Sequence, residues 1–236
     1  KSTLISILTG NLKADSGKVC LDGEDVNKMG EAYRKILGYM RQQQALYPAF
    51  RVGAFLDYMA ALKGMEKKEA RAQIPAILEM VELSEYAGSK IKTLSGGMKQ
   101  RVVIAIAMIC NPELIICDEP TTALDVTIQA QIMDLLKELQ LKEGKSIILI
   151  THNMGLVAEM ADEVCVMYMG RVVEFGTLED IFDHTSHPYT RALLRSVPVL
   201  GLADDQKLET IPGATPNPAD LKGGCEFADR CSECMD

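Results

Sequence analysis

The sequence lacks an excess of basic residues and lacks any long apolar run. Its 25 Lys and Arg are outnumbered by 33 Asp and Glu, so the net charge is −8. Non-specific nucleic-acid binding needs clustered Lys and Arg to neutralise phosphates, so nucleic acid is not an expected partner. The longest clean apolar run, residues 102–110, is far shorter than the ~20 residues that cross a bilayer. Any role at a membrane therefore requires a partner protein.

The given sequence also shows no sign of a secretory leader or of a disulfide framework. No signal peptide is visible, although the sequence opens at Lys1, so that a true N-terminus cannot be inspected. The sequence has seven cysteines, an odd number that cannot all pair in disulfides within one chain. Four lie in apolar or strand-like stretches typical of reduced, buried thiols, and three crowd the end of the chain: Cys20, Cys110, Cys117 and Cys165, then Cys225, Cys231 and Cys234. This usage predicts a reducing, cytosolic compartment.

What the sequence does contain is an alternation of helical and strand-like segments. Its 236 residues, 47% apolar and 25% charged, fit one globular domain with appendages. Strand patterns fall at residues 18–21, 36–40, 114–117, 147–150 and 164–167, with a hairpin partner at 171–174, and helical patterns at 1–8, 52–92, 96–109, 127–141 and 154–161. Strands that alternate with helices predict an α/β fold with a mainly parallel sheet covered on both faces.

Two acids, Asp118 and Glu119, directly follow the apolar strand at 114–117. This pattern puts both carboxylates at the carboxyl edge of a parallel sheet, where open α/β sheets bind ligands. Asp118 is placed to hold Mg²⁺ through water, and Glu119 to orient or deprotonate an attacking water. Two solvated acids at a strand end fit the same pattern.

Two short segments carry features of phosphate sites. Gly96 and Gly97 open a helix with free backbone N–H groups that can face an anion, and Ser95 adds a hydroxyl. An ordinary serine-capped helix is the alternative. Residues 1–3, Lys-Ser-Thr before a helix, match the end of a G-x-x-x-x-G-K-[ST] phosphate loop whose glycines would precede residue 1.

The string Leu-Ser-Gly-Gly-Met-Lys-Gln-Arg at 94–101 resembles the signature of ABC ATPases, and other motifs follow in that family's order. They are the end of Walker A at Lys1-Ser2-Thr3, the Q-loop glutamine Gln42, Walker B at Asp118-Glu119, the D-loop Ala123-Leu124-Asp125 and the switch histidine His152. The resemblance implies a P-loop NTPase fold whose first strand and Walker A glycines are missing from this chain. Such a chain is expected to hydrolyse ATP weakly or not at all.

The resemblance also implies a domain plan. It predicts a RecA-like nucleotide-binding core over residues 1–51 and 93–197, a helical subdomain over 52–92, and a cysteine-containing tail over 198–236.

The same resemblance assigns a role to each motif residue. Two subunits would sandwich two ATP molecules with Mg²⁺. The implied catalytic residues are Glu119, His152 and Gln42, and the implied Mg²⁺ ligands are Ser2, Gln42 and Asp118. The implied nucleotide-binding residues are Lys1, Ser2, Thr3, Gln42, Asp118 and His152 on one subunit, with Ser95, Gly96, Gly97 and Asp125 serving the nucleotide across the interface.

From the signature onward the resemblance narrows to the ATPase subunits of oligopeptide and dipeptide importers, a group that also serves nickel and glutathione. The matching strings are residues 118–131, 187–194, 211–213 and 224–231. This resemblance implies a peripheral protein at the cytoplasmic face of the membrane. Its implied partners are permease subunits, a second ABC ATPase subunit and, indirectly, an extracytoplasmic substrate-binding protein.

The tail of that family can hold an iron–sulfur cluster, and Cys225 and Cys231 match its first two ligands. Cys234 does not stand at the usual next spacing. Because such a cluster needs about four thiolates, it is expected only in a longer form of the chain. Three reduced thiols are the alternative.

The first third of the chain departs from the importer pattern. Residues 42–48 and 55–64 resemble exporter-type ABC ATPases, and Arg41 stands where proline is common. A hybrid sequence, or a misassembled reading frame, with a seam near the signature would explain the difference. Three alternatives stay open at this point: an exporter-type ATPase, an ABC ATPase without a transport role, and an inactive truncated fragment.

Overall fold

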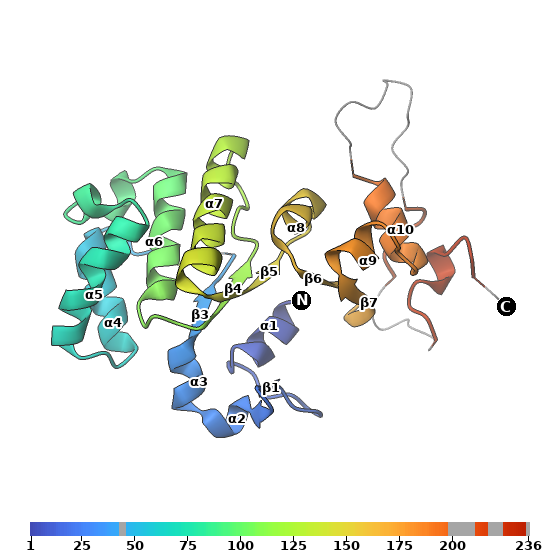
Figure 1. Cartoon of the computed structure of the whole chain (residues 1–236), viewed down its shortest axis with the longest axis horizontal. Helices are drawn as coiled ribbons and strands as arrows, with labels where there is room; N and C mark the ends of the chain where they lie inside the picture. The colour runs from blue at the N-terminus through green and yellow to red at the C-terminus, as the bar shows by residue number, and fades with distance from the viewer. Residues whose placement is uncertain (43–45, 198–210, 217–223, 235–236) are drawn as a thin grey trace. The chain divides into compact units, whose positions relative to one another are not determined.

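The computed structural model describes residues 1–42, 46–197, 211–216 and 224–234. They form two compact units, Lys1–His152 and Asn153–Asp236, which are described separately below (Figure 1).

A three-stranded parallel sheet lies at the centre of the first unit. Its strands are β3 (Leu37–Met40), β4 (Leu114–Asp118) and β5 (Ser146–Ile150), in the spatial order β3-β4-β5. The middle strand is the most buried, with Ile115, Ile116 and Cys117 at 1% exposure or less. Register pairs Met40 with Cys117 and Asp118 with Ile150, so the carboxyl ends of all three strands meet at one edge. The predicted α/β class with a parallel sheet is confirmed.

Helices cover this sheet in two groups. In Figure 1, α6 and α7 lie on the opposite side of the sheet from α1 and α3. The bounds are α1 (Ser2–Leu8), α2 (Val26–Met29), α3 (Glu31–Ile36), α6 (Gly96–Met108) and α7 (Val126–Glu143). Val26 and Tyr33 share a core cluster with Leu37 and Ile116 of the sheet. A small hairpin, β1 (Cys20–Leu21) with β2 (Glu24–Asp25), precedes α2.

The longest apolar run of the sequence, residues 102–110, lies mostly in helix α6. Residues 102–109 are all buried, because α6 packs among other helices and against the sheet. The close approach to β3 is visible at Gly38, where an added Cβ would come within 2.8 Å of the Ala107 carbonyl oxygen. The run is therefore a core helix. In the part of the chain that the structure describes, no helix is long and apolar enough to cross a bilayer.

The stretch predicted to be helical over 52–92 contains two helices and two 3₁₀ turns. They are α4 (Val52–Leu62), α5 (Lys67–Met80) and the turns Ser84–Tyr86 and Ile91–Thr93. Phe55, Leu56 and Ala60 of α4 and Ile74, Ile77 and Leu78 of α5 are buried. These are the apolar positions that a helical spacing brings to one face.

The second unit is built on an antiparallel hairpin. Strands β6 (Glu163–Tyr168) and β7 (Arg171–Thr177) pair across a tight turn at Met169-Gly170, where both residues have positive φ. Two positive φ values match the twist of a two-residue hairpin loop. The remaining elements are α8 (Met154–Met160), α9 (Leu178–Phe182), α10 (Pro188–Arg195) and a 3₁₀ turn at Ala228–Arg230.

Four short helices escape the periodicity analysis: α2, α3, α9 and α10. Length alone does not explain this, because α10 has eight residues and the predicted α1 and α8 have seven each. Three of the four carry a capping side chain, and at α2 it is Asp25. Thr177 and Asp180 form a capping box at α9, and Pro188 opens α10 after the cap residue His187. Much of the tail predicted over 198–236 lies outside the described residues.

The close packing of β3 against α6 gives a prediction for Gly38→Ala. The added methyl would meet the Ala107 carbonyl at 2.8 Å and the Pro112 ring at 3.0 Å, so the strand or the helix must move. We expect the free energy of unfolding to fall by about 1–3 kcal/mol, as measured by urea denaturation. The exposed Gly88, where an added Cβ meets nothing within 4 Å, is the control. Equal stability of Gly38→Ala and Gly88→Ala would contradict the packing.

Candidate functional site

The acid pair sits at the carboxyl end of the central strand. Asp118 ends β4 and Glu119 follows it, and both residues are buried, at 9% and 8% exposure. The backbone of Glu119 has a left-handed φ of 51°, and its N–H donates to the carbonyl of Ile150 on β5 at 2.8 Å. Such a conformation costs a non-glycine residue of the order of 1–3 kcal/mol and is found most often at functional sites.

Three segments that are distant in sequence meet at these carboxylates. The Lys1 ammonium lies 2.8 Å from Oε1 of Glu119 and 3.1 Å from Oδ1 of Asp118. His152 Nδ1 lies 2.9 Å from the same Glu119 oxygen, and the Thr151 hydroxyl donates to Glu119 Oε2 at 3.4 Å. The structure thus brings Lys1, Asp118, Glu119 and His152 together, as expected for one site, and adds Thr151.

The cluster shifts the titration of its members. Burial alone would raise the pKa of Glu119, but hydrogen bonds from His152 and Lys1 outweigh it and hold that pKa below its ordinary value of 4.5. Burial would lower the pKa of Lys1, but hydrogen bonds to Glu119 and Asp118 outweigh it and hold that pKa above 10.5. At neutral pH Lys1 is therefore an ammonium ion and Glu119 is a carboxylate that is available as a base.

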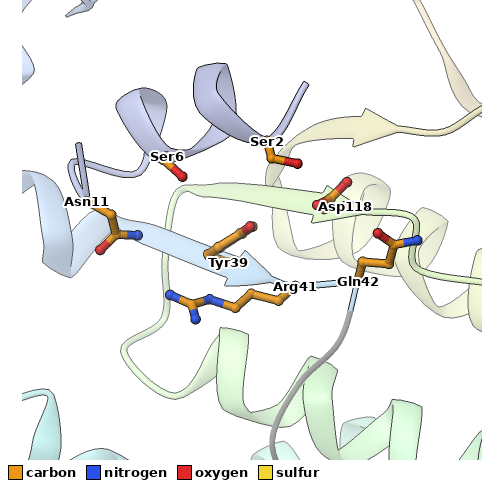
Figure 2. Close-up of a pocket in the computed structure, with 7 residues that line it drawn as sticks. All are labelled: Ser2, Ser6, Asn11, Tyr39, Arg41, Gln42 and Asp118. Carbon is orange, nitrogen blue, oxygen red and sulfur yellow. The ribbon is translucent and has the colours of Figure 1, made fainter. Parts of the chain in front are cut away.

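A pocket of about 280 Å³ opens beside Asp118. Figure 2 shows the residues that line it: Ser2, Ser6, Asn11, Tyr39, Arg41, Gln42 and Asp118. Ser2, Gln42 and Asp118 gather at one end of the pocket in this view, from α1, the segment after β3, and β4. These are the three residues predicted to hold Mg²⁺.

The oxygen atoms that Ser2, Gln42 and Asp118 offer in this pocket are suitable ligands for Mg²⁺. A hydroxyl, an amide oxygen and a carboxylate are hard oxygen ligands of the kind that magnesium prefers. Asp118 Oδ1 is buried and, among the described residues, accepts no well-formed hydrogen bond, although the Lys1 ammonium lies 3.1 Å away. A buried carboxylate oxygen whose close partner among the described residues is a mobile ammonium group is suited to a cation or to its water shell.

The starts of α6 and α7 form a second polar region. Ser95 caps α6, where its hydroxyl accepts from the Met98 N–H at 3.3 Å, and Asp125 caps α7 by accepting from the Ile128 N–H at 3.0 Å. A Cβ at Gly97 would lie 2.7 Å from Ile128 Cγ2, so only glycine allows the two helix starts to pack this closely. Ser95 and Asp125 are therefore helix caps in the single chain, and their roles toward a nucleotide stay predictions. Thr3 is exposed in the first turn of α1, and its role stays a prediction too.

Two known protein families match the chain, and both are consistent with the geometry of the site. The family model described as "ABC transporter" matches residues 1–122, and the one described as "Oligopeptide/dipeptide transporter, C-terminal region" matches residues 173–236. The chain belongs to the ABC transporter family. Within that family it is an ATP-binding subunit and an ATPase.

Curated relatives of this ABC ATPase align over nearly its whole length. The oligopeptide transport ATP-binding protein AppD of Bacillus subtilis is 45% identical over 95% of the chain and 71% of its own length. The dipeptide transport ATP-binding protein DppD of the same organism is 43% identical over 94% of the chain and 70% of its own length. The oligopeptide transport ATP-binding protein OppD of Haemophilus influenzae is 40% identical over 97% and 73%. At this coverage, the similarity to these peptide transport ATP-binding proteins extends over most of the first third of the chain.

Solved structures confirm the ABC ATPase fold, a P-loop NTPase fold. The cbiO1 subunit of Clostridium perfringens, part of the transporter complex cbiONQ, superposes with a TM-score of 0.69 at 31% identity, over 77% of this chain and 74% of that one. A dimeric ATP-binding cassette in a post-hydrolysis state with ADP and Pi gives a TM-score of 0.63 at 30% identity, over 75% and 80%.

The cysteines at the end of the chain do not form a metal centre in the part that the structure describes. Cys225 Sγ lies 3.9 Å from His187 Nε2, and the Glu233 N–H donates to Cys231 Sγ at 3.4 Å. Within the described ranges, no three or more His, Cys, Asp or Glu side chains form a group that could hold a metal ion. The expectation that Cys225 and Cys231 are cluster ligands has no support here.

Sequence reasoning missed part of the site wall. Thr151, Tyr39 and Arg41 were not singled out as site residues, yet Thr151 contacts Glu119, and Arg41 stacks over the Tyr39 ring at 5.6 Å inside the pocket. Thr151 and Arg41 directly follow the last residues of β5 and β3. The rule that parallel strands end at one edge was applied to β4 and would have found them on its neighbours.

The ion pairs at this site make stability depend on pH. Because the folded-state pKa of Glu119 is lowered, its contribution is fully present above pH 4.5 and is lost as pH falls through the folded-state pKa. The raised pKa of Lys1 acts oppositely, with a contribution present below 10.5 and lost as pH rises through its folded-state value. We expect Glu119→Gln to lower the free energy of unfolding near neutral pH and to have a smaller effect at about pH 3.

Urea denaturation at the two pH values measures this difference. Glu85→Gln is the control, because Glu85 is exposed and has no ion pair among the residues that the structure describes. A destabilisation by Glu119→Gln that stays the same at both pH values would contradict the ionised pairing.

Proposed function

We propose that this chain hydrolyses ATP to power the uptake of oligopeptides or dipeptides through a membrane permease. The observation that carries the ATPase mechanism is the cluster at the end of β4, where Lys1 and His152 both reach Glu119. The match to the C-terminal region of oligopeptide/dipeptide transporters, together with three relatives named for peptide transport, supports the cargo class.

Lys1 is the residue that binds phosphate in this mechanism. Its ammonium is held by Asp118 and Glu119 in the single chain, and its side chain is 43% exposed. The β- and γ-phosphates of ATP compete with these carboxylates for the ammonium. When Lys1 turns to the phosphates, Glu119 loses one of its two close Oε1 contacts and is free to bind water.

The pocket beside Asp118 holds the metal. Ser2, Gln42 and Asp118 would hold Mg²⁺ or its bound water, and the ion supplies neutralisation of the negative charge that spreads over the transferring phosphoryl group. The protein contributes position, because the three ligands come from elements fixed by the sheet. No covalent intermediate is needed, since the acceptor is water.

Glu119 orients and deprotonates the attacking water. Its lowered pKa keeps it ionised at neutral pH, and His152 fixes Oε1 while Thr151 contacts Oε2. His152 also contacts the γ-phosphate, so the same ring that holds the base detects the substrate. Gln42 completes the catalytic set from the segment after β3.

A second ATPase subunit completes each nucleotide site in this proposal. Ser95, Gly96 and Gly97 at the start of α6 face the nucleotide of the neighbouring copy, and Asp125 at the start of α7 couples the two sites. The packing of Gly97 against Ile128 supports this assignment, because it keeps both helix starts at one surface. Closure on ATP and opening after hydrolysis would drive the permease.

The proposal places the chain at the cytoplasmic face of the membrane, held there by permease subunits, with a substrate-binding protein delivering peptide from the other side. An iron–sulfur cluster forms no part of it, because about four thiolates are needed and the described residues offer no such group. An exporter-type role is the second candidate, and the pattern of residues 42–48 and 55–64 favours it.

Replacing Glu119 by Gln in a full-length form of the subunit tests the mechanism. We expect ATP binding to be retained, because Lys1, Ser2 and Asp118 remain, and turnover to fall by about 10²–10⁴-fold, as general-base catalysis contributes. Nucleotide binding by fluorescence and phosphate release by a coupled assay measure the two quantities. Glu85→Gln is the matched control, with unchanged turnover. Turnover by Glu119→Gln within twofold of the control, on the order of the assay error, would reject Glu119 as the base.

Reconstitution tests the cargo. The chain is assembled with its permease partners in vesicles, and ATP hydrolysis is measured with oligopeptides, dipeptides, nickel, glutathione or hydrophobic drugs on either side. We expect peptides on the side opposite the ATPase to be accumulated and to stimulate hydrolysis. Stimulation by drugs on the ATPase side would support the exporter alternative instead, and a subunit that never assembles with a permease would reject both.

A further inference from the structure

Arg101 joins the helix that carries the signature turn to the end of the preceding helical segment. It lies on α6, a few residues after the turn at 95–97, and its side chain is only 13% exposed. Its Nη1 donates to the Val81 carbonyl at 3.1 Å and lies 2.9 Å from Glu82 Oε2. These partners are twenty and nineteen residues earlier in the sequence, just beyond the end of α5.

The end of α5 needs such a partner. The last carbonyl groups of a helix have no partner within the helix, and a cation is favoured there by the helix dipole. Val81, the C-cap residue of α5, is 0% exposed, so its carbonyl has little access to water. Glu82 then takes a left-handed φ of 56°, which turns the chain out of the helix. Arg101 satisfies the buried carbonyl and pairs with the Glu82 carboxylate.

Helix α6 therefore contacts α5 and α7 within its first two turns. Gly97 packs against Ile128 of α7, and Arg101 holds the end of α5. Directly after Arg101 the buried run at 102–109 begins. The position of the first turn of α6, which Ser95 caps, thus depends on contacts with α5 and α7 as well as on α6 itself.

We propose that Arg101 is a positioning residue that ties the turn at 95–97 to the α4–α5 helices, so that the turn moves with them as one piece toward a neighbouring subunit's nucleotide. This inference rests on the proposed function. Arg101 does not touch the Lys1, Asp118 and Glu119 cluster in the structure, so its effect should appear in the association of two subunits and not in the first binding of ATP.

Four variants separate this role from simple stabilisation. Arg101→Met removes the charge and both contacts while keeping an apolar stem, and Arg101→Lys keeps the charge and one donor for the Val81 carbonyl. Glu82→Gln removes the ion pair alone, and the Glu82 side chain is 74% exposed. Arg71→Met is the matched control, on the exposed face of α5 and without an ion pair among the described residues.

Three readouts are taken on the intact subunit: affinity for ATP, kcat and KM for hydrolysis, and ATP-driven association of two copies in a Glu119→Gln background. We expect Arg101→Met to lose association and to lower kcat by about tenfold to a hundredfold, as misplacement of a binding element does. Its ATP affinity should stay within about twofold of wild type, since the cluster at β4 is untouched. Arg101→Lys should restore part of both quantities, and Glu82→Gln and Arg71→Met should behave as wild type.

Two results would overturn the inference. One is unchanged kcat and association in Arg101→Met beside a working wild type. The other is an equal loss of ATP affinity and association together with a lower unfolding midpoint, which is the mark of a purely structural role. If Arg101→Met does not fold, Arg101→Lys decides, and full association by that variant rejects the inference. A full-length wild type, with the complete phosphate loop, that neither hydrolyses ATP nor associates rejects the proposed function itself.

Discussion

The ion pairing of Lys1 with two buried carboxylates is the interaction on which the site depends. Asp118 and Glu119 are adjacent, nearly inaccessible to solvent and both negatively charged. Taking such charges out of water is costly unless a counter-ion and hydrogen bonds replace the lost hydration. The Lys1 ammonium supplies the positive charge, and residues 151–152 supply the hydrogen bonds. The start of α1 is thereby held against the middle strand of the sheet.

Much of the fold around this pairing could be predicted from the sequence. Buried strands of a parallel sheet are continuous apolar runs, and the segments around 114–117 and 147–150 show them clearly. The acids after the first of these runs locate the sheet edge. Short helices are harder, since α2 has four residues and α9 has five. Their formation depends on caps and on packing against the hairpins, which an apolar period does not detect.

Within the site, sequence reasoning located the residue types better than their conformations. It placed Glu119 beside water and metal, but the left-handed backbone that turns this residue comes from a hydrogen bond to β5. It assigned Ser95 and Asp125 to a nucleotide, whereas in the single chain both cap helices. One side chain can serve as a cap in one state and contact a ligand in another, and a sequence alone does not separate the two. In the sequence Arg101 is only the last residue of the signature string, and its contacts with Val81 and Glu82 form only when the chain folds.

His152 and the Glu119 carboxylate that it contacts differ widely in solvent exposure. The side chain of His152 is 84% exposed, while that of the carboxylate it contacts is 8% exposed. A group that binds to the exposed side of that imidazole changes the electrostatic potential at a Glu119 oxygen that solvent scarcely reaches. The imidazole of His152 is therefore the exposed end of a contact whose other end, the Glu119 carboxylate, is buried.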